Sequence, residues 1–138
     1  MLLNASTNTE KLVIGIGCDR GTPLNTLEHV LIQALSEVNA SFEDIISFAT
    51  IDKKADEEAI NTLVKNLDKP IIYYPASELA QVEVPNPSEV VMKYVGTPAV
   101  SEAAAILAAK TTMKNLLVEK LKYRGEDGKN ATISIVKT

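Results

Sequence analysis

The chain has 138 residues, of which 46% are hydrophobic and 4% aromatic, so we expect one domain with an aliphatic core. A formal net charge of −4 without a basic block argues against a nucleic-acid partner, and no apolar run approaches the ~18 residues of a membrane span. One cysteine excludes an internal disulfide, and residues 1–10 lack a signal-peptide pattern, so we expect a cytoplasmic protein with a flexible leader (1–10) and a single domain (11–138).

The first half of the chain alternates apolar strands with amphipathic helices. Strands are predicted at 11–16, 45–51 and 70–74, and helices at 23–38 and 55–67. Thr22 is the predicted N-cap of the first helix, with Pro23 at its first position. Apolar strands joined by helices are typical of a parallel sheet with right-handed crossovers.

The second half departs from this alternation. A short helical piece is predicted at 76–82, a proline loop at 84–89, helices at 88–95 and 97–110, and strands at 115–119 and 131–136. Asp127-Gly128 is a turn signal, so the last two strands are expected to form an antiparallel hairpin. The predicted fold class is α/β, a three-layer α/β/α domain with a mainly parallel sheet and this C-terminal hairpin.

A glycine loop follows the first predicted strand, with glycines at 15, 17 and 21 around Cys18-Asp19-Arg20. A strand that leads through such a loop into a helix favours binding of an anionic group. The spacing G-x-G-x-x-x-G departs from the dinucleotide fingerprint, and Asp52 lies too far along to be its ribose-binding acid. Nucleotide binding is therefore kept only as an alternative.

Nucleophilic and metal chemistry are disfavoured by what the chain lacks. Cys18 and His29 are its only cysteine and histidine, which is too few for a zinc site. His29 is expected on the surface of the first helix, and no Cys-His or Ser-His-Asp arrangement can be built from the sequence. Neither a metal nor another resident cofactor is expected.

Cations are predicted to gather at one edge of the sheet. Lys54 follows the second strand, and Lys120 and Lys122 alternate around Leu121, so the latter two should project to one face. Gly-Thr-Pro occurs at 21–23 and again at 96–98, each marking a helix start. These features are typical of capped helices and solvated faces. Together with Arg20, they also suit a ligand with several carboxylates.

Four segments in order, 15–21, 50–57, 84–89 and 95–105, resemble the C-terminal domain of the cobalamin-biosynthesis protein CbiG and the stand-alone CobE proteins. The resemblance runs from about Val13 to the end of the chain. It implies a three-layer α/β/α domain in corrin-ring assembly, with a precorrin or cobalt-precorrin intermediate as ligand and other cobalamin-pathway enzymes as partners. CbiG is the cobalt-precorrin 5A hydrolase, which opens a ring lactone and releases acetaldehyde.

Three departures from the family pattern bear on function. Asp19 stands where the family often has a basic residue, and Glu119 where it often has proline. Both lower the local positive charge. The N-terminal domain of CbiG is not among these 138 residues, so the length resembles CobE more closely. Any hydrolase activity is expected to need a second domain or partner.

The sequence and the resemblance together predict a ligand site at the carboxyl edge of the sheet. The alternative is a non-catalytic carrier that hands the intermediate to a partner enzyme. If the chain is catalytic, Asp52 and Glu57 are the acid/base candidates. The predicted ligand-binding residues are Gly17, Cys18, Arg20, Gly21, Thr22, Lys54, Asn86, Gly96, Thr97, Glu102, Lys120 and Lys122.

Overall fold

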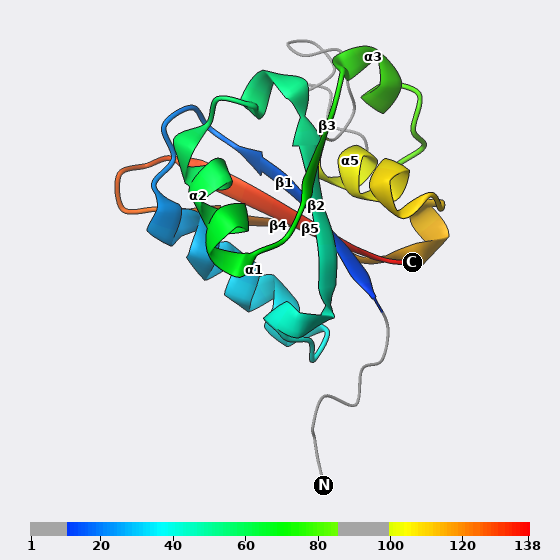
Figure 1. Cartoon of the computed structure of the whole chain (residues 1–138), viewed down its shortest axis with the longest axis horizontal. Coiled ribbons are helices and arrows are strands. Elements are labelled where there is room, and N and C mark those ends of the chain that lie inside the picture. Colours follow the sequence, from blue (N-terminus) through cyan, green and yellow to red (C-terminus); the bar gives the residue numbers. More distant parts are fainter. Residues whose placement is uncertain (1–10, 86–99) are drawn as a thin grey trace, which may run out of the picture.

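A five-stranded mixed sheet forms the centre of the fold in the computed structural model, which describes residues 11–85 and 100–138 (Figure 1). The strand order is β3-β2-β1-β5-β4. Strands β1 (Leu12–Cys18), β2 (Ile45–Ile51) and β3 (Ile71–Tyr74) pair in parallel. Strand β5 (Asn130–Lys137) lies antiparallel between β1 and β4 (Leu116–Arg124).

The prediction of a mainly parallel sheet is wrong, whereas the predicted C-terminal hairpin is confirmed. Two of the four described strand pairings are antiparallel, because β5 inserts beside β1 instead of lying at an edge. The burial of the two hairpin strands explains this choice. Strand β5 buries Ala131, Ile133, Ser134, Ile135 and Val136, whereas β4 buries only Val118 and so takes the edge.

Helices cover both faces of the sheet, as the α/β/α prediction requires (Figure 1). On one face lie α1 (Leu24–Glu37) and α2 (Glu58–Leu67), and on the other α3 (Ala76–Leu79) and α5 (Val100–Ala109). Within the described ranges, three 3-10 turns adjoin strands: η1 (Phe42–Asp44), η2 (Asp52–Lys54) and η3 (Met113–Asn115). No described helix is long and apolar enough to cross a membrane.

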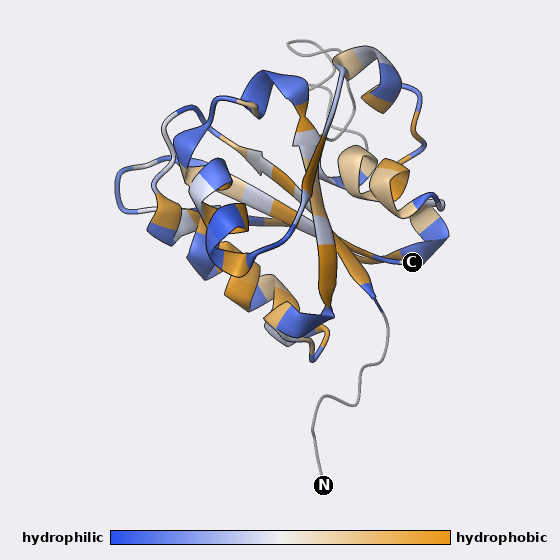
Figure 2. Ribbon diagram, in the orientation of Figure 1, coloured by the Kyte–Doolittle hydropathy of each residue, from blue (hydrophilic) through white to orange (hydrophobic). Residues whose placement is uncertain are grey.

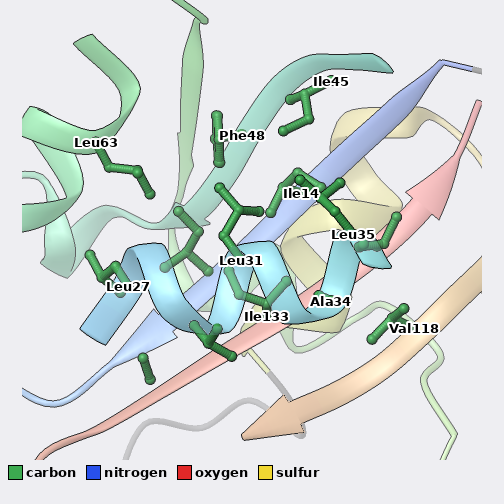
Figure 3. Packing of buried hydrophobic residues seen from close by; sticks show 14 of the residues in the cluster. Ile14, Leu27, Leu31, Ala34, Leu35, Ile45, Phe48, Leu63, Val118 and Ile133 are labelled. Atoms are coloured by element: carbon green, nitrogen blue, oxygen red, sulfur yellow. The ribbon is translucent and has the colours of Figure 1, made fainter. Parts of the chain in front are cut away.

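The α1 face holds the larger apolar core. Leu27, Leu31 and Leu35 recur at intervals of four residues along α1 and pack toward Ile14 and Ile133 of the sheet (Figure 3). All five side chains are at most 3% exposed. Burial of a leucine or isoleucine of this size stabilises the fold by roughly 1.5–3 kcal/mol.

The α5 face is packed more closely, because its helix is rich in alanine. Helix α5 is apolar along most of its length, whereas α1 and α2 alternate between apolar and polar segments (Figure 2). Ala103, Ala104 and Ala105 are fully buried. A Cβ on Gly15 of β1 would overlap the Ser101 carbonyl, so the glycine lets α5 lie directly on the strand.

The carboxyl ends of four strands meet at one edge of the sheet. Since β5 runs antiparallel to both of its neighbours, β4 points in the same direction as β1, β2 and β3. The start of β5 completes this edge, which we call the carboxyl edge. The predicted leader (1–10), the helix at 88–95 and the repeated Gly-Thr-Pro at 96–98 lie outside the described residues. The single-domain organisation remains a prediction.

Candidate functional site

Arg20 lies in the loop after β1 and is bound by carboxylates of the segment before α2. Its guanidinium Nη1 is 2.8 Å from Asp56 Oδ1 and 3.0 Å from Glu57 Oε1, and its Nη2 donates to the Lys53 carbonyl at 3.2 Å. The hydrogen bond from Arg20 holds the pKa of Asp56 below its usual range, and that of the arginine is raised in turn. The side chain of Arg20 is still 60% exposed, and a guanidinium has five donors, so donors remain for a ligand.

Glu57 is the buried centre of this loop. Its side chain is 5% exposed, and Oε2 accepts a 2.8 Å hydrogen bond from the Gly21 amide. Oε1 pairs with Arg20 by charge at 3.0 Å but has no hydrogen bond of acceptable geometry within the described chain. A carboxylate held by a backbone amide and a guanidinium is a structural tie between β1 and α2, and it is poorly placed to abstract a proton from a ligand.

The rest of the loop is tied to the start of β5. Asp19 accepts hydrogen bonds from the Asn130 amide at 2.8 Å and from its side chain at 3.2 Å. The Thr22 hydroxyl donates to the Asp19 carbonyl at 2.7 Å, and the Thr22 amide also donates to that carbonyl. The prediction of Thr22 as helix N-cap is therefore wrong: Pro23 holds that position, and α1 begins at Leu24. The amides of Gly21 and Thr22 are both occupied within the protein.

Cys18 and Lys54 lie at the carboxyl edge on the α1 side. Cys18 packs against the α1-face core, and burial raises the pKa of its thiol, while the charge of Lys54 acts in the opposite direction. Lys54 is half-buried in η2, and Asp52 of the same turn is exposed. A thiol of raised pKa is predominantly protonated at neutral pH, which agrees with the expectation that nucleophilic chemistry is disfavoured.

A second group of predicted residues lies across the sheet, on the α5 side. Gly17, Thr132 and Lys122 are neighbours in adjacent strands, because Gly17 pairs with Thr132 and Thr132 with Lys122. The residues on either side of each of them pack on the α1-face core, so all three face the α5 side. Gly17 and Thr132 are half-buried and Lys122 is exposed. We call this row the polar shelf.

Next to the polar shelf, α5 buries an acidic residue. The Glu102 side chain is 0% exposed, and its Oε1 lies 3.9 Å from Nζ of Lys120, whose side chain is 30% exposed. Neither carboxylate oxygen has a hydrogen-bond partner within the described chain. Burial raises the pKa of Glu102 to about 7, against the opposing charge of Lys120; the charge of Glu119 raises it further.

Two serines complete this buried polar group, and the sequence analysis missed both. Ser101 and Ser134 are 3% and 0% exposed, and their hydroxyls are 2.8 Å apart. Ser134 also donates to the Glu119 carbonyl. A signal was present in the sequence for Ser134, which stands between Ile133 and Ile135, and a weaker one for Ser101, which stands between Val100 and Glu102. The pairing of Ser134 with Gly15, on which Ser101 packs, brings the two serines together under α5.

The predicted residues thus form two groups on opposite faces of the carboxyl edge. Arg20, Gly21, Lys54 and Glu57 lie on the α1 and α2 side, and Lys120, Lys122 and Glu102 on the α5 side, with Gly17 and Cys18 adjacent in β1. Lys120 and Lys122 share a face, as expected. Asn86, Gly96 and Thr97 lie outside the described residues. Within the described ranges, no cluster of three or more His, Cys, Asp or Glu side chains could hold a metal ion.

The fold is that of a CobE-type α/β/α domain. A crystal structure of CobE, a protein from the cobalamin biosynthetic pathway, matches with a TM-score of 0.78 at 29% identity. The match covers 95% of this chain and 92% of that structure. The family model described as "Cobalamin synthesis G C-terminus" matches residues 12–136, so the chain belongs to this family of cobalamin-biosynthesis domains.

Two relatives agree with this assignment and confirm the resemblance. The cobalt-precorrin-5A hydrolase of Priestia megaterium is 33% identical over 124 residues, which cover 90% of this chain and 31% of the hydrolase. Protein CobE of a Sinorhizobium species is 33% identical over 100 residues, covering 71% of this chain and 65% of that protein. The chain therefore spans about a third of the hydrolase and slightly less than two thirds of the Sinorhizobium protein.

Proposed function

We propose that the chain binds a precorrin or cobalt-precorrin intermediate at the carboxyl edge, with the ligand's acidic side chains over the polar shelf. The observation that carries this proposal is the row of Gly17, Thr132 and Lys122 beside Lys120, where an acidic protein gathers cations over a half-buried strand surface. Carboxylates pair well with ammonium groups and hydroxyls. Family membership supports a corrin precursor as their source. The proposed location is the cytoplasm.

The cations on the α5 side and those on the α1 side are expected to contribute differently to ligand binding. Lys120 and Lys122 bind ligand carboxylates on the α5 side, and Lys54 extends this set from the α1 side. Arg20 offers its remaining donors but also ties its loop to Asp56 and Glu57. Its substitution should therefore weaken binding partly by loosening the loop.

Titration of the purified chain with hydrogenobyrinic acid, followed by the visible absorbance of the corrinoid, tests this proposal. We expect binding at micromolar concentrations and weaker binding by Lys122→Gln and by Arg20→Ala. Lys65→Gln is the matched control, because Lys65 is an exposed lysine near the C-terminal end of α2. Absence of binding, or two site variants that match the parent, would refute the proposed site. Thermal stabilisation by NADP in place of the corrinoid would favour the nucleotide alternative.

Lactone opening with release of acetaldehyde is the reaction we propose if the bound intermediate is also transformed. The name of the Priestia megaterium relative motivates this step, which needs an activated water and a donor for the developing oxyanion. Asp52 is the more accessible of the two acid/base candidates. The engagement of Glu57 by Gly21 and Arg20 favours the carrier alternative.

Incubation of the chain with the lactone intermediate distinguishes an enzyme from a non-catalytic carrier. Release of acetaldehyde that is lost in Asp52→Asn indicates an enzyme. Tight binding without acetaldehyde, which then appears only when a separate CbiG N-terminal domain is added, indicates a carrier or accessory module.

A further inference from the structure

Glu102 is a buried carboxyl group of α5. Its side chain is 0% exposed, and both carboxylate oxygens lack a partner within the described residues. Buried polar atoms in folded proteins almost always have a partner, so each exception calls for an explanation. The ammonium group of Lys120, at 3.9 Å, is too distant for a good hydrogen bond but close enough to act by charge.

Among the described residues, the charges that act on Glu102 come from β4. In β4, Lys120 and Glu119 act on it by charge, and Lys122 lies farther along the same face. From the other described parts of the chain that lie against α5, the nearby ionisable groups are Tyr74 of β3, Glu78 of α3 and Glu83. The residues that β1, β2 and β5 present to α5 are all neutral: Val13, Gly15, Ala49, Ile51, Ser134 and Val136.

We infer that Glu102 and Lys120 form a proton-linked subsite for a carboxylate of the ligand. In this arrangement the partly exposed Lys120 pairs with the carboxylate, and protonated Glu102 behind it does not offset the ammonium charge. The inference rests on the proposed function and deepens it, because it assigns a protonation state to the binding of one acidic side chain.

The ligand carboxylate reaches Lys120 and not Glu102, because the Glu102 side chain is 0% exposed. At 3.9 Å from Nζ, an ionised Glu102 would neutralise part of the ammonium charge, whereas protonated Glu102 leaves that charge to the ligand. Lys120 is 30% exposed and adjoins the polar shelf, so it connects the buried carboxyl group to the surface. An ionised Glu102 would also repel the incoming carboxylate by charge, so binding favours the acid form.

The coupling has a defined proton balance. When Glu102 is ionised in the free protein, one proton is taken from the buffer for each ligand bound, and it stays on Glu102 in the complex. The pKa of about 7 means that this uptake develops between pH 6 and pH 8. Affinity should therefore fall about tenfold over that interval. The side-chain carboxyl groups of a corrinoid ionise below pH 6, so they contribute little to this change.

Calorimetric titration of the whole chain with hydrogenobyrinic acid at pH 6, 7 and 8, in two buffers of different ionisation enthalpy, measures affinity and proton uptake together. The parent is expected to bind about tenfold more weakly at pH 8 than at pH 6, with close to one proton taken up at pH 8. Glu102→Gln keeps the side chain neutral at every pH. It should therefore retain the pH 6 affinity at every pH, without proton uptake.

One control variant and one argument separate the effect of Glu102 from other pH effects. Glu43→Gln, an exposed residue of η1 at the opposite edge of the sheet, should keep the parental profile. His29, stacked on Tyr123 with ring centroids 4.0 Å apart, is present in every variant and cannot explain a difference between them. Binding by the parent that is independent of pH, or the parental pH profile in Glu102→Gln, would overturn the subsite alone. No binding by the parent at any pH would overturn the proposed function as well.

Discussion

Glu102 makes the stability of the chain depend on pH. Its pKa of about 7 lies above the ordinary value of 4.5, so the folded state binds more protons than the unfolded chain between these values. The stability associated with this group is fully present below pH 4.5 and is lost as the pH rises to about 7. The maximal loss is roughly 3 kcal/mol.

Glu102→Gln removes this loss, because the amide does not ionise. The variant and the parent should have similar free energies of unfolding at pH 4.5. The variant should then become progressively more stable than the parent up to pH 7, and the difference should stay constant above it. Urea unfolding at several pH values measures this, with Glu43→Gln as the control. A difference that does not change with pH would show that Glu102 ionises at its ordinary pKa in the folded chain.

The carboxylate of Glu57 supports the loop after β1 through two partners. Glu57→Ala leaves the Gly21 amide without its acceptor and removes one of the two carboxylates that bind Arg20. We expect a loss of about 1–3 kcal/mol in the free energy of unfolding, because a part-buried donor loses its partner. Asp56→Ala is the matched control. It removes an exposed carboxylate from the same arginine and should cost much less. Equal losses in the two variants would assign the effect to charge alone.

At the scale of elements, Gly15 and Gly17 differ in how closely α5 packs on strand β1. A Cβ at Gly15 overlaps the Ser101 backbone, which can move only if α5 moves with it. A Cβ at Gly17 meets only the Thr132 Cβ, at 3.9 Å, among the described residues. Gly15→Ala should therefore lower the free energy of unfolding by at least about 2 kcal/mol, and Gly17→Ala should change it by about 0.5 kcal/mol or less. Thermal melts of the two variants test this. Similar melting temperatures would contradict the close packing of α5.

Most elements could be predicted from sequence periodicity, because their core contacts repeat along the helix or strand. Strand β2 has the predicted bounds, and α1 differs from its prediction by one residue at each end. The predicted helix over 55–67 instead begins at Glu58, after η2. Glu57 is turned toward Gly21, a contact between residues 36 apart, and no local pattern contains it. The position of β5 depends in the same way on competition among strands for the centre of the sheet.

The sequence predicted which residues lie at the candidate site but not which of them contact one another. The predicted strand ends alone were enough to expect Lys54, Lys120 and Lys122 at the carboxyl edge. The irregular register of β4 on both sides of Val118 was not foreseen. It lies where Lys120 is brought to Glu102, a partner 18 residues away in sequence. That partnership needs the antiparallel β5, so no reading of β4 alone could find it.

On the scale of the whole molecule, two electrostatic effects oppose each other. The net charge of −4 repels a ligand with several carboxylates, whereas Lys120 and Lys122 attract it locally. Charges more than about 10 Å apart are screened at 0.1 M salt, so contacts at the polar shelf should outweigh the dispersed acidic charge. Added salt should therefore weaken binding, because it screens the attraction between the ligand carboxylates and these two lysines.

Lys122→Gln should show this directly. An exposed ion pair contributes about 0.2–1 kcal/mol, so the variant should bind hydrogenobyrinic acid roughly 1.4- to 5-fold more weakly at low salt. It should also lose less affinity than the parent when salt is raised from about 0.05 to 0.5 M. Lys11→Gln carries the same change in net charge at the opposite edge of the sheet and should leave both quantities near the parental values. Equal effects of the two substitutions would mean that net charge governs binding, and tighter binding of the parent in high salt would place the ligand away from these lysines.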